Sequence, residues 1–129
     1  MSIKQIFLQQ IDNFINELSN LFPNDGDIQL FSEKYNLIRS ANSKLIIEYF
    51  VQFIYPFKNQ IIDKDDQFFL GGGGQEELKD KSGLKFRDSI KKIWISEMST
   101  DNKEIVWKYF KTFVLLSEKY IIENLDKNK

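Results

Sequence analysis

The spacing of the large apolar residues constrains the fold more than any other feature of this sequence. Between residues 3 and 22, apolar side chains recur at steps of three and four, at Ile3, Phe7, Ile11, Phe14, Leu18 and Leu21. Such spacing places them on one stripe of an α-helix. No segment alternates polar and apolar residues for long enough to predict a strand. We therefore predict an all-α protein.

Turn-forming residues and helix caps separate the first three predicted helices. The first helix is expected to end at the turn formers of residues 23–26, and Asp27 is expected to cap the second. The second helix should run to about Ile38. Asn42 or Ser43 is expected to cap the third, because both side chains can accept a hydrogen bond from the first helical turn.

The third predicted helix is apolar on nearly every side. Between residues 45 and 55 only Glu48 and Gln52 are polar, which is typical of a buried helix. Pro56 is expected to disrupt or kink this helix, because its ring removes an N–H donor and restricts the preceding residue. Residues 57–70 are then expected to hold one or two helical turns.

Two further helices are predicted in the C-terminal half of the chain. One runs from Leu84 to Met98, and the other from a cap within residues 99–101 to about Leu125. One apolar stripe of the last helix consists of Ile105, Tyr109, Phe113, Leu116 and Tyr120, and a second consists of Trp107, Val114, Ile121 and Leu125. Two stripes indicate two packing partners. We expect a compact bundle of about five helices, with the third and fifth at its centre.

The chain is expected to form a single domain over residues 1–129. Its 42% hydrophobic content is too high for a disordered chain, and its length suffices for a core without disulfides or metal. Gly71 to Gly74 stand together in a chain with six Gly in all, which predicts a flexible linker at about residues 71–75. The sequence leaves open whether this linker is an engineered loop replacement or a natural loop.

The composition argues against most catalytic centres. The chain contains no His and no Cys, so it lacks the commonest general base, the thiol nucleophile and the usual zinc ligands. The acidic residues near the glycines, which offer oxygen ligands without a fixed spacing, are Asp63, Asp65, Asp66, Glu76, Glu77 and Asp80. We therefore expect a non-enzymatic protein with no cofactor and no bound metal.

Charge and hydropathy indicate an intracellular protein without a membrane role. The 18 basic and 19 acidic residues leave no net charge to direct the chain toward nucleic acid or an anionic membrane. No apolar run approaches the roughly 20 residues of a membrane-spanning helix, and the N-terminus lacks the apolar core of a signal peptide. The absence of disulfides suits the same compartment.

The candidate protein interface lies on the second stripe of the last helix. Its residues, which are either core or exposed anchors for another protein, are Trp107, Val114, Ile121 and Leu125. Glu97 is a further candidate, because helical projection places it between Ile90, Ile93 and Trp94 on an apolar face. A buried, unpaired carboxylate is costly. Hence the helix ends before Glu97, the carboxylate is paired, or this end of the face is open to a partner.

A locally basic stretch at residues 79–92 provides an alternative site. Its candidate phosphate contacts are Lys81, Lys85, Arg87 and Lys92. The stretch lacks the Arg richness and the interleaved exposed aromatic residues of a nucleic-acid surface, which favours an ordinary charged helix face.

Three stretches carry a pattern of aromatic residues and helix caps. They are Phe14 to Pro23 with the acidic turn after it, Asp65 to Leu70, and Ile93 to Phe110. Together they resemble small uncharacterised proteins of large nucleocytoplasmic DNA viruses, such as mimivirus and phycodnavirus relatives. The resemblance covers most of the chain outside residues 71–83. It implies a viral source and a place in the infected cell's cytoplasm or nucleus, or in the virion.

The leading hypothesis is a non-enzymatic protein–protein interaction module of a large DNA virus, acting in virion assembly or on a host factor. The expected partner is another viral or host protein, and homo-oligomerisation is left open. The alternative is an accessory nucleic-acid-binding protein of viral replication or transcription, which would use the basic stretch at residues 79–92.

Overall fold

Residues 2–70 and 84–127 are described in a computed structural model, and this part of the chain contains helices and no strand. The elements are α1 (Ile3–Leu21), α2 (Gly26–Ala41), α3 (Ser43–Ile54), η1 (Tyr55–Phe57), α4 (Lys58–Ile62), α5 (Gln67–Leu70), α7 (Phe86–Ser96) and α8 (Thr100–Lys127). The all-α prediction is confirmed, with α1, α2, α3, α7 and α8 as the main helices. The predicted Gly-rich linker lies outside the described residues.

Side chains cap the helices close to the predicted positions, with one error. The Asn42 side chain accepts a hydrogen bond from the Leu45 N–H at 3.2 Å, which confirms it as the cap of α3. The prediction of Asp27 as the cap of α2 is wrong. Asp25 takes that position, because its Oδ1 accepts from the Ile28 N–H at 2.9 Å. Asp27 lies in the first turn instead, where an acidic side chain favours the helix dipole.

At Pro56 the chain changes from an α-helix to a short 3₁₀-helix. Pro56 lies in the first turn of the short 3₁₀-helix η1, where its missing N–H donor would have no helical partner. The chain then continues into α4 and α5, which are short helices in the segment where one or two turns are predicted.

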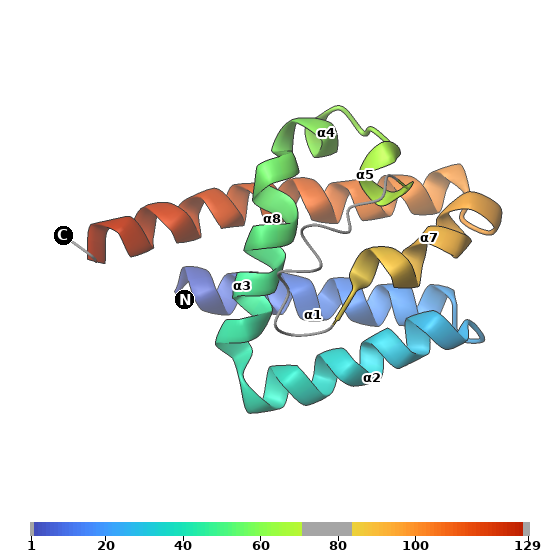
Figure 1. The fold of residues 1–129 in the computed structure, drawn as a ribbon, viewed down its shortest axis with the longest axis horizontal. Coiled ribbons are helices and arrows are strands. Elements are labelled where there is room, and N and C mark those ends of the chain that lie inside the picture. Colours follow the sequence, from blue (N-terminus) through green and yellow to red (C-terminus); the bar gives the residue numbers. More distant parts are fainter. Residues whose placement is uncertain (1, 71–83, 128–129) are drawn as a thin grey trace.

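The main helices form a bundle in which α8 is the longest element, with 28 residues. Figure 1 shows α1 and α8 side by side and antiparallel, with α3 crossing both; α8 contacts α1, α3 and α4. α2 contacts α1, α3 and α7, and α7 also contacts α5. The C-terminal end of α8 extends past the start of α1 (Figure 1).

Aromatic rings form the centre of the core, and Phe110 on α8 lies among them. Its ring is fully buried. Six rings have centroids between 5.2 and 6.4 Å from it, those of Phe14, Phe53, Phe68, Phe69, Phe86 and Phe113. These rings come from α1, α3, α5, α7 and α8. One side chain therefore joins five helices of the bundle.

Candidate functional site

The second apolar stripe of the last predicted helix divides between core and surface. Trp107 and Val114 are each only 3% exposed. The Trp107 ring contacts Phe69 and Trp94, with centroids 5.0 and 5.4 Å away. The hypothesis that these two side chains are exposed anchors is therefore wrong, because both are buried. Rings of α5 and α7 cover Trp107. Both side chains belong to the core, which is the other alternative that the sequence allowed.

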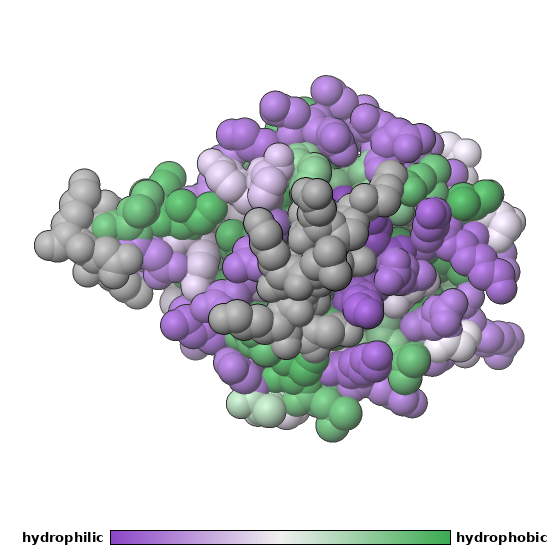
Figure 2. All heavy atoms as spheres, viewed as in Figure 1, coloured by the Kyte–Doolittle hydropathy of each residue, from purple (hydrophilic) through white to green (hydrophobic). Residues whose placement is uncertain are grey.

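The remaining two residues of that stripe lie on an apolar surface of α8. Ile121 is half-buried and Leu125 is 59% exposed. Leu115 and Ile122, which belong to neither predicted stripe, are 60% and 59% exposed. We refer to Leu115, Ile121, Ile122 and Leu125 as the α8 apolar face. Figure 2 shows hydrophobic residues gathered on the end of α8 that projects from the bundle.

A sequence signal for this face existed. Leu115 and Ile122 are seven residues apart, so two helical turns place them on the same side of α8. Leu115 and Ile122 form a third line of apolar residues on this helix, outside both predicted stripes. Such a surplus of apolar residues is itself an indication of exposed apolar surface.

Charged residues of both signs border the α8 apolar face. Lys119 is exposed, and Glu118 is half-buried with its carboxylate 3.9 Å from the Lys58 ammonium group. Glu123 lies one residue after Ile122 and is half-buried. Charged and apolar side chains are thus mixed on this part of α8, as they are on many protein–protein contact surfaces.

Glu97 lies at the C-terminus of α7. The helix ends at Ser96, and Glu97 is its exposed C-cap, with its N–H donating to the Ile93 carbonyl at 2.9 Å. The helix therefore ends before the carboxylate is buried, as one of the three alternatives from the sequence requires. Glu97 and Lys92 line an open hollow of about 430 Å³ beside the turn between α1 and α2.

The basic stretch does not form one charged surface. Lys85 and Lys92 are exposed, whereas Arg87 is 5% exposed. Arg87 is therefore wrong as a phosphate contact, because its side chain points into the protein. Lys81 lies outside the part of the chain that the structure describes. Of the three predicted contacts within the described residues, Lys85 and Lys92 are exposed, and the exposed Asp88 lies between them in the sequence.

The Arg87 side chain instead contacts a backbone carbonyl and three aromatic rings inside the protein. Its Nε donates a hydrogen bond to the Phe68 carbonyl at 2.5 Å. The guanidinium carbon lies 5.0, 5.1 and 5.5 Å from the ring centroids of Phe53, Phe68 and Phe57. A planar cation stacks favourably on aromatic rings, and more so where water is excluded. Arg87 thus ties the start of α7 to α3, η1 and α5.

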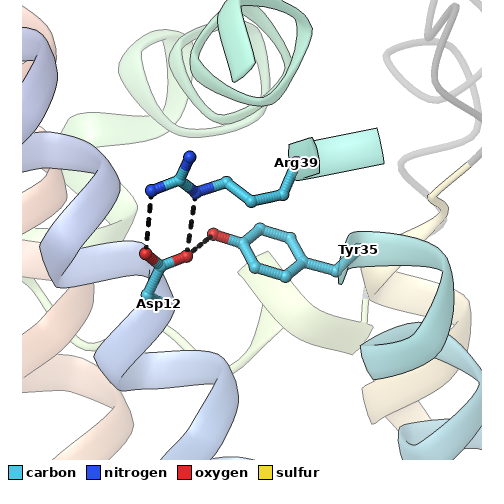
Figure 3. A network of polar contacts seen from close by, with 3 residues as sticks. All are labelled: Asp12, Tyr35 and Arg39. Carbon is cyan, nitrogen blue, oxygen red and sulfur yellow. Dashed lines mark hydrogen bonds and ion pairs between the residues drawn. The ribbon is translucent and has the colours of Figure 1, made fainter. Parts of the chain in front are cut away.

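A second polar network joins α1 to α2. Asp12 accepts a hydrogen bond from the Tyr35 hydroxyl at 2.5 Å, and Arg39 donates to both of its carboxylate oxygens, at 3.1 and 3.2 Å (Figure 3). Tyr35 is buried, and burial, followed by the hydrogen bond to Asp12, raises its pKa well above the ordinary value of 10.0. The neutral hydroxyl is therefore the state that the fold requires.

Replacing Asp12 with Ala is expected to lower the free energy of unfolding by about 1.5–3 kcal/mol, because the buried Tyr35 hydroxyl loses a charged acceptor. Arg39→Ala should cost less than about 1 kcal/mol, since the side chains of this ion pair are 35% and 34% exposed and water screens them. Urea unfolding of the two variants measures both values. Equal losses would show that the ion pair, and not the tyrosine, carries the stability of this network.

Tyr109 makes a similar contact between α8 and α1. Its hydroxyl donates to the Glu17 carboxylate at 2.8 Å. Partial burial, followed by this hydrogen bond, raises the pKa of Tyr109 to about 12. Both hydroxyls that join α1 to its neighbours, Tyr35 and Tyr109, thus hold their protons more tightly in the folded protein than in the unfolded chain.

The stability of the protein is expected to fall as the pH rises from about 10 toward 12, because the unfolded tyrosines lose their protons first. Below about pH 10 these groups are protonated in both states and contribute no slope. Urea unfolding between about pH 9 and pH 11 measures the slope. Tyr35→Phe and Tyr109→Phe should each reduce the slope, which assigns it to the two tyrosines. Unchanged slopes in both variants would contradict this assignment.

Two further searches concern the part of the chain that the structure describes. Within residues 2–70 and 84–127, no group of three or more acidic side chains lies close enough together to hold a metal ion. None of the helices in these same ranges combines the length and the apolar character needed to cross a membrane.

Comparisons with protein-family models, with curated proteins and with solved structures found no match to this chain.

Proposed function

We propose that this protein is a non-enzymatic protein–protein interaction module and that the α8 apolar face is its contact surface. The observation that carries the proposal is the grouping of Leu115, Ile122 and Leu125, all more than half exposed, with the half-buried Ile121 on one side of the C-terminal half of α8. A single exposed apolar side chain is ordinary, but several of them on one side of a helix are more typical of a binding surface.

Other exposed apolar residues support this choice by contrast. Ile62 and Ile95 each stand alone on α4 and α7. Leu30 and Leu37 lie seven residues apart on α2, without a third large exposed apolar residue on that helix. Among the described residues, α8 thus carries the largest such group. It is also the element whose end extends from the bundle, so a partner can approach it without displacing another helix.

The absence of His and Cys from the whole sequence supports the non-enzymatic part of the proposal. The strongly perturbed side chains support it as well. Tyr35, whose pKa is raised most, is a buried link between α1 and α2. Its environment serves stability, which is the ordinary role of a hydroxyl held by a carboxylate inside a core.

We further propose, on the resemblance of the three sequence stretches, that the module belongs to a large DNA virus and acts in virion assembly or on a host factor. The alternative, an accessory nucleic-acid-binding protein, loses support from the burial of Arg87. Among the described residues of the basic stretch, the exposed lysines that still support it are Lys85, Lys91 and Lys92.

Affinity capture from infected-cell lysate tests the proposal. The variant combines Ile122→Lys with Leu125→Lys, and the matched control is Ile95→Lys, a similarly exposed residue that stands alone on α7. Two buried charges in a contact surface should reduce capture of a specific partner at least about tenfold, or 1.4 kcal/mol. The control should capture as much as the parent. Circular dichroism establishes that all proteins fold.

Each other outcome is informative. Sedimentation of the purified parent shows whether a second copy of the chain occupies the face, in which case the double variant becomes monomeric. Equal capture by parent, control and double variant contradicts the proposed surface. Recovery that nuclease removes, and that is lost when Lys85 and Lys92 are changed to Glu, would favour nucleic-acid binding instead.

A further inference from the structure

We draw no further inference here: the strongest candidate, the open hollow between the α1–α2 turn and the C-terminal end of α7, is lined by the exposed side chains of Lys92 and Glu97, and none of the described residues around it is a buried polar group that would point to a particular ligand.

Discussion

Phe110→Ala is expected to lower the free energy of unfolding by about 3–5 kcal/mol, the range for truncating a fully buried Phe. The reason is its position. The ring contacts six other aromatic rings from five helices, so the cavity cannot close by the movement of one neighbour. Much of a typical domain's stability of about 5–15 kcal/mol would be lost. Urea or guanidinium unfolding followed by circular dichroism measures the difference.

Leu37→Ala is the matched control for this truncation. Leu37 is 72% exposed on α2, so the loss of its side chain should change the free energy of unfolding by no more than about 0.5 kcal/mol. A loss below about 1 kcal/mol in Phe110→Ala would show that the rings around it close the cavity, and would contradict the central role of this residue.

Arg87→Ala is expected to lower the free energy of unfolding by about 2–4 kcal/mol. The hydrogen bond from a charged donor to the Phe68 carbonyl contributes about 1.5–3 kcal/mol. Stacking on desolvated rings adds about 2 kcal/mol, and relief of the desolvation of the charge offsets part of the sum. Denaturant unfolding measures the result.

Two further substitutions separate charge from shape at this position. Arg87→Lys keeps the charge but lacks the planar group that stacks on the Phe rings, so it should restore little of the lost stability. Arg87→Met keeps the apolar part of the side chain without the charge. A Met variant as stable as the parent would show that packing alone accounts for the role of Arg87, and would overturn the contribution of the cation.

The helices could be predicted because their signals are local. Asn42 lies directly before an apolar run and caps α3, and Ser99 caps α8 by accepting from the Asn102 N–H at 3.1 Å. The error at α2 has the same origin. Asp25 and Asp27 are both suitable caps, and the choice depends on where the chain leaves the turn, which the residues themselves do not specify.

The burial of individual side chains depends on tertiary contacts, which the local sequence pattern does not specify. Phe110 belongs to neither predicted stripe of the last helix, yet it is fully buried, because α1, α3 and α4 all pack against α8. The burial of Arg87 carried a signal that was missed. Residues 87, 90 and 94 have helical spacing, so Arg87 lies on the apolar face of α7 together with Ile90 and Trp94.

The scarcity of arginine was a second signal. Only Arg39 and Arg87 interrupt a set of 18 basic residues that is otherwise lysine. Both occur where a planar, forked cation has a structural role, one on a carboxylate and the other on a carbonyl and aromatic rings. In a lysine-rich chain, an arginine therefore indicates a position where the planar guanidinium makes contacts that a lysine ammonium group cannot make.

The antiparallel pairing of α1 with α8 sets an order of events during synthesis. The ribosome produces α1 first, but the helix that covers part of its apolar stripe begins only at Thr100. Until then Phe14 has neither Phe110 nor Phe113, the α8 rings whose centroids lie 5.5 and 5.8 Å from it in the folded protein. The nascent chain therefore carries an α1 whose apolar stripe only α2 and α3 can cover in part. The rest of the stripe is open to aggregation or to chaperones until α8 has emerged.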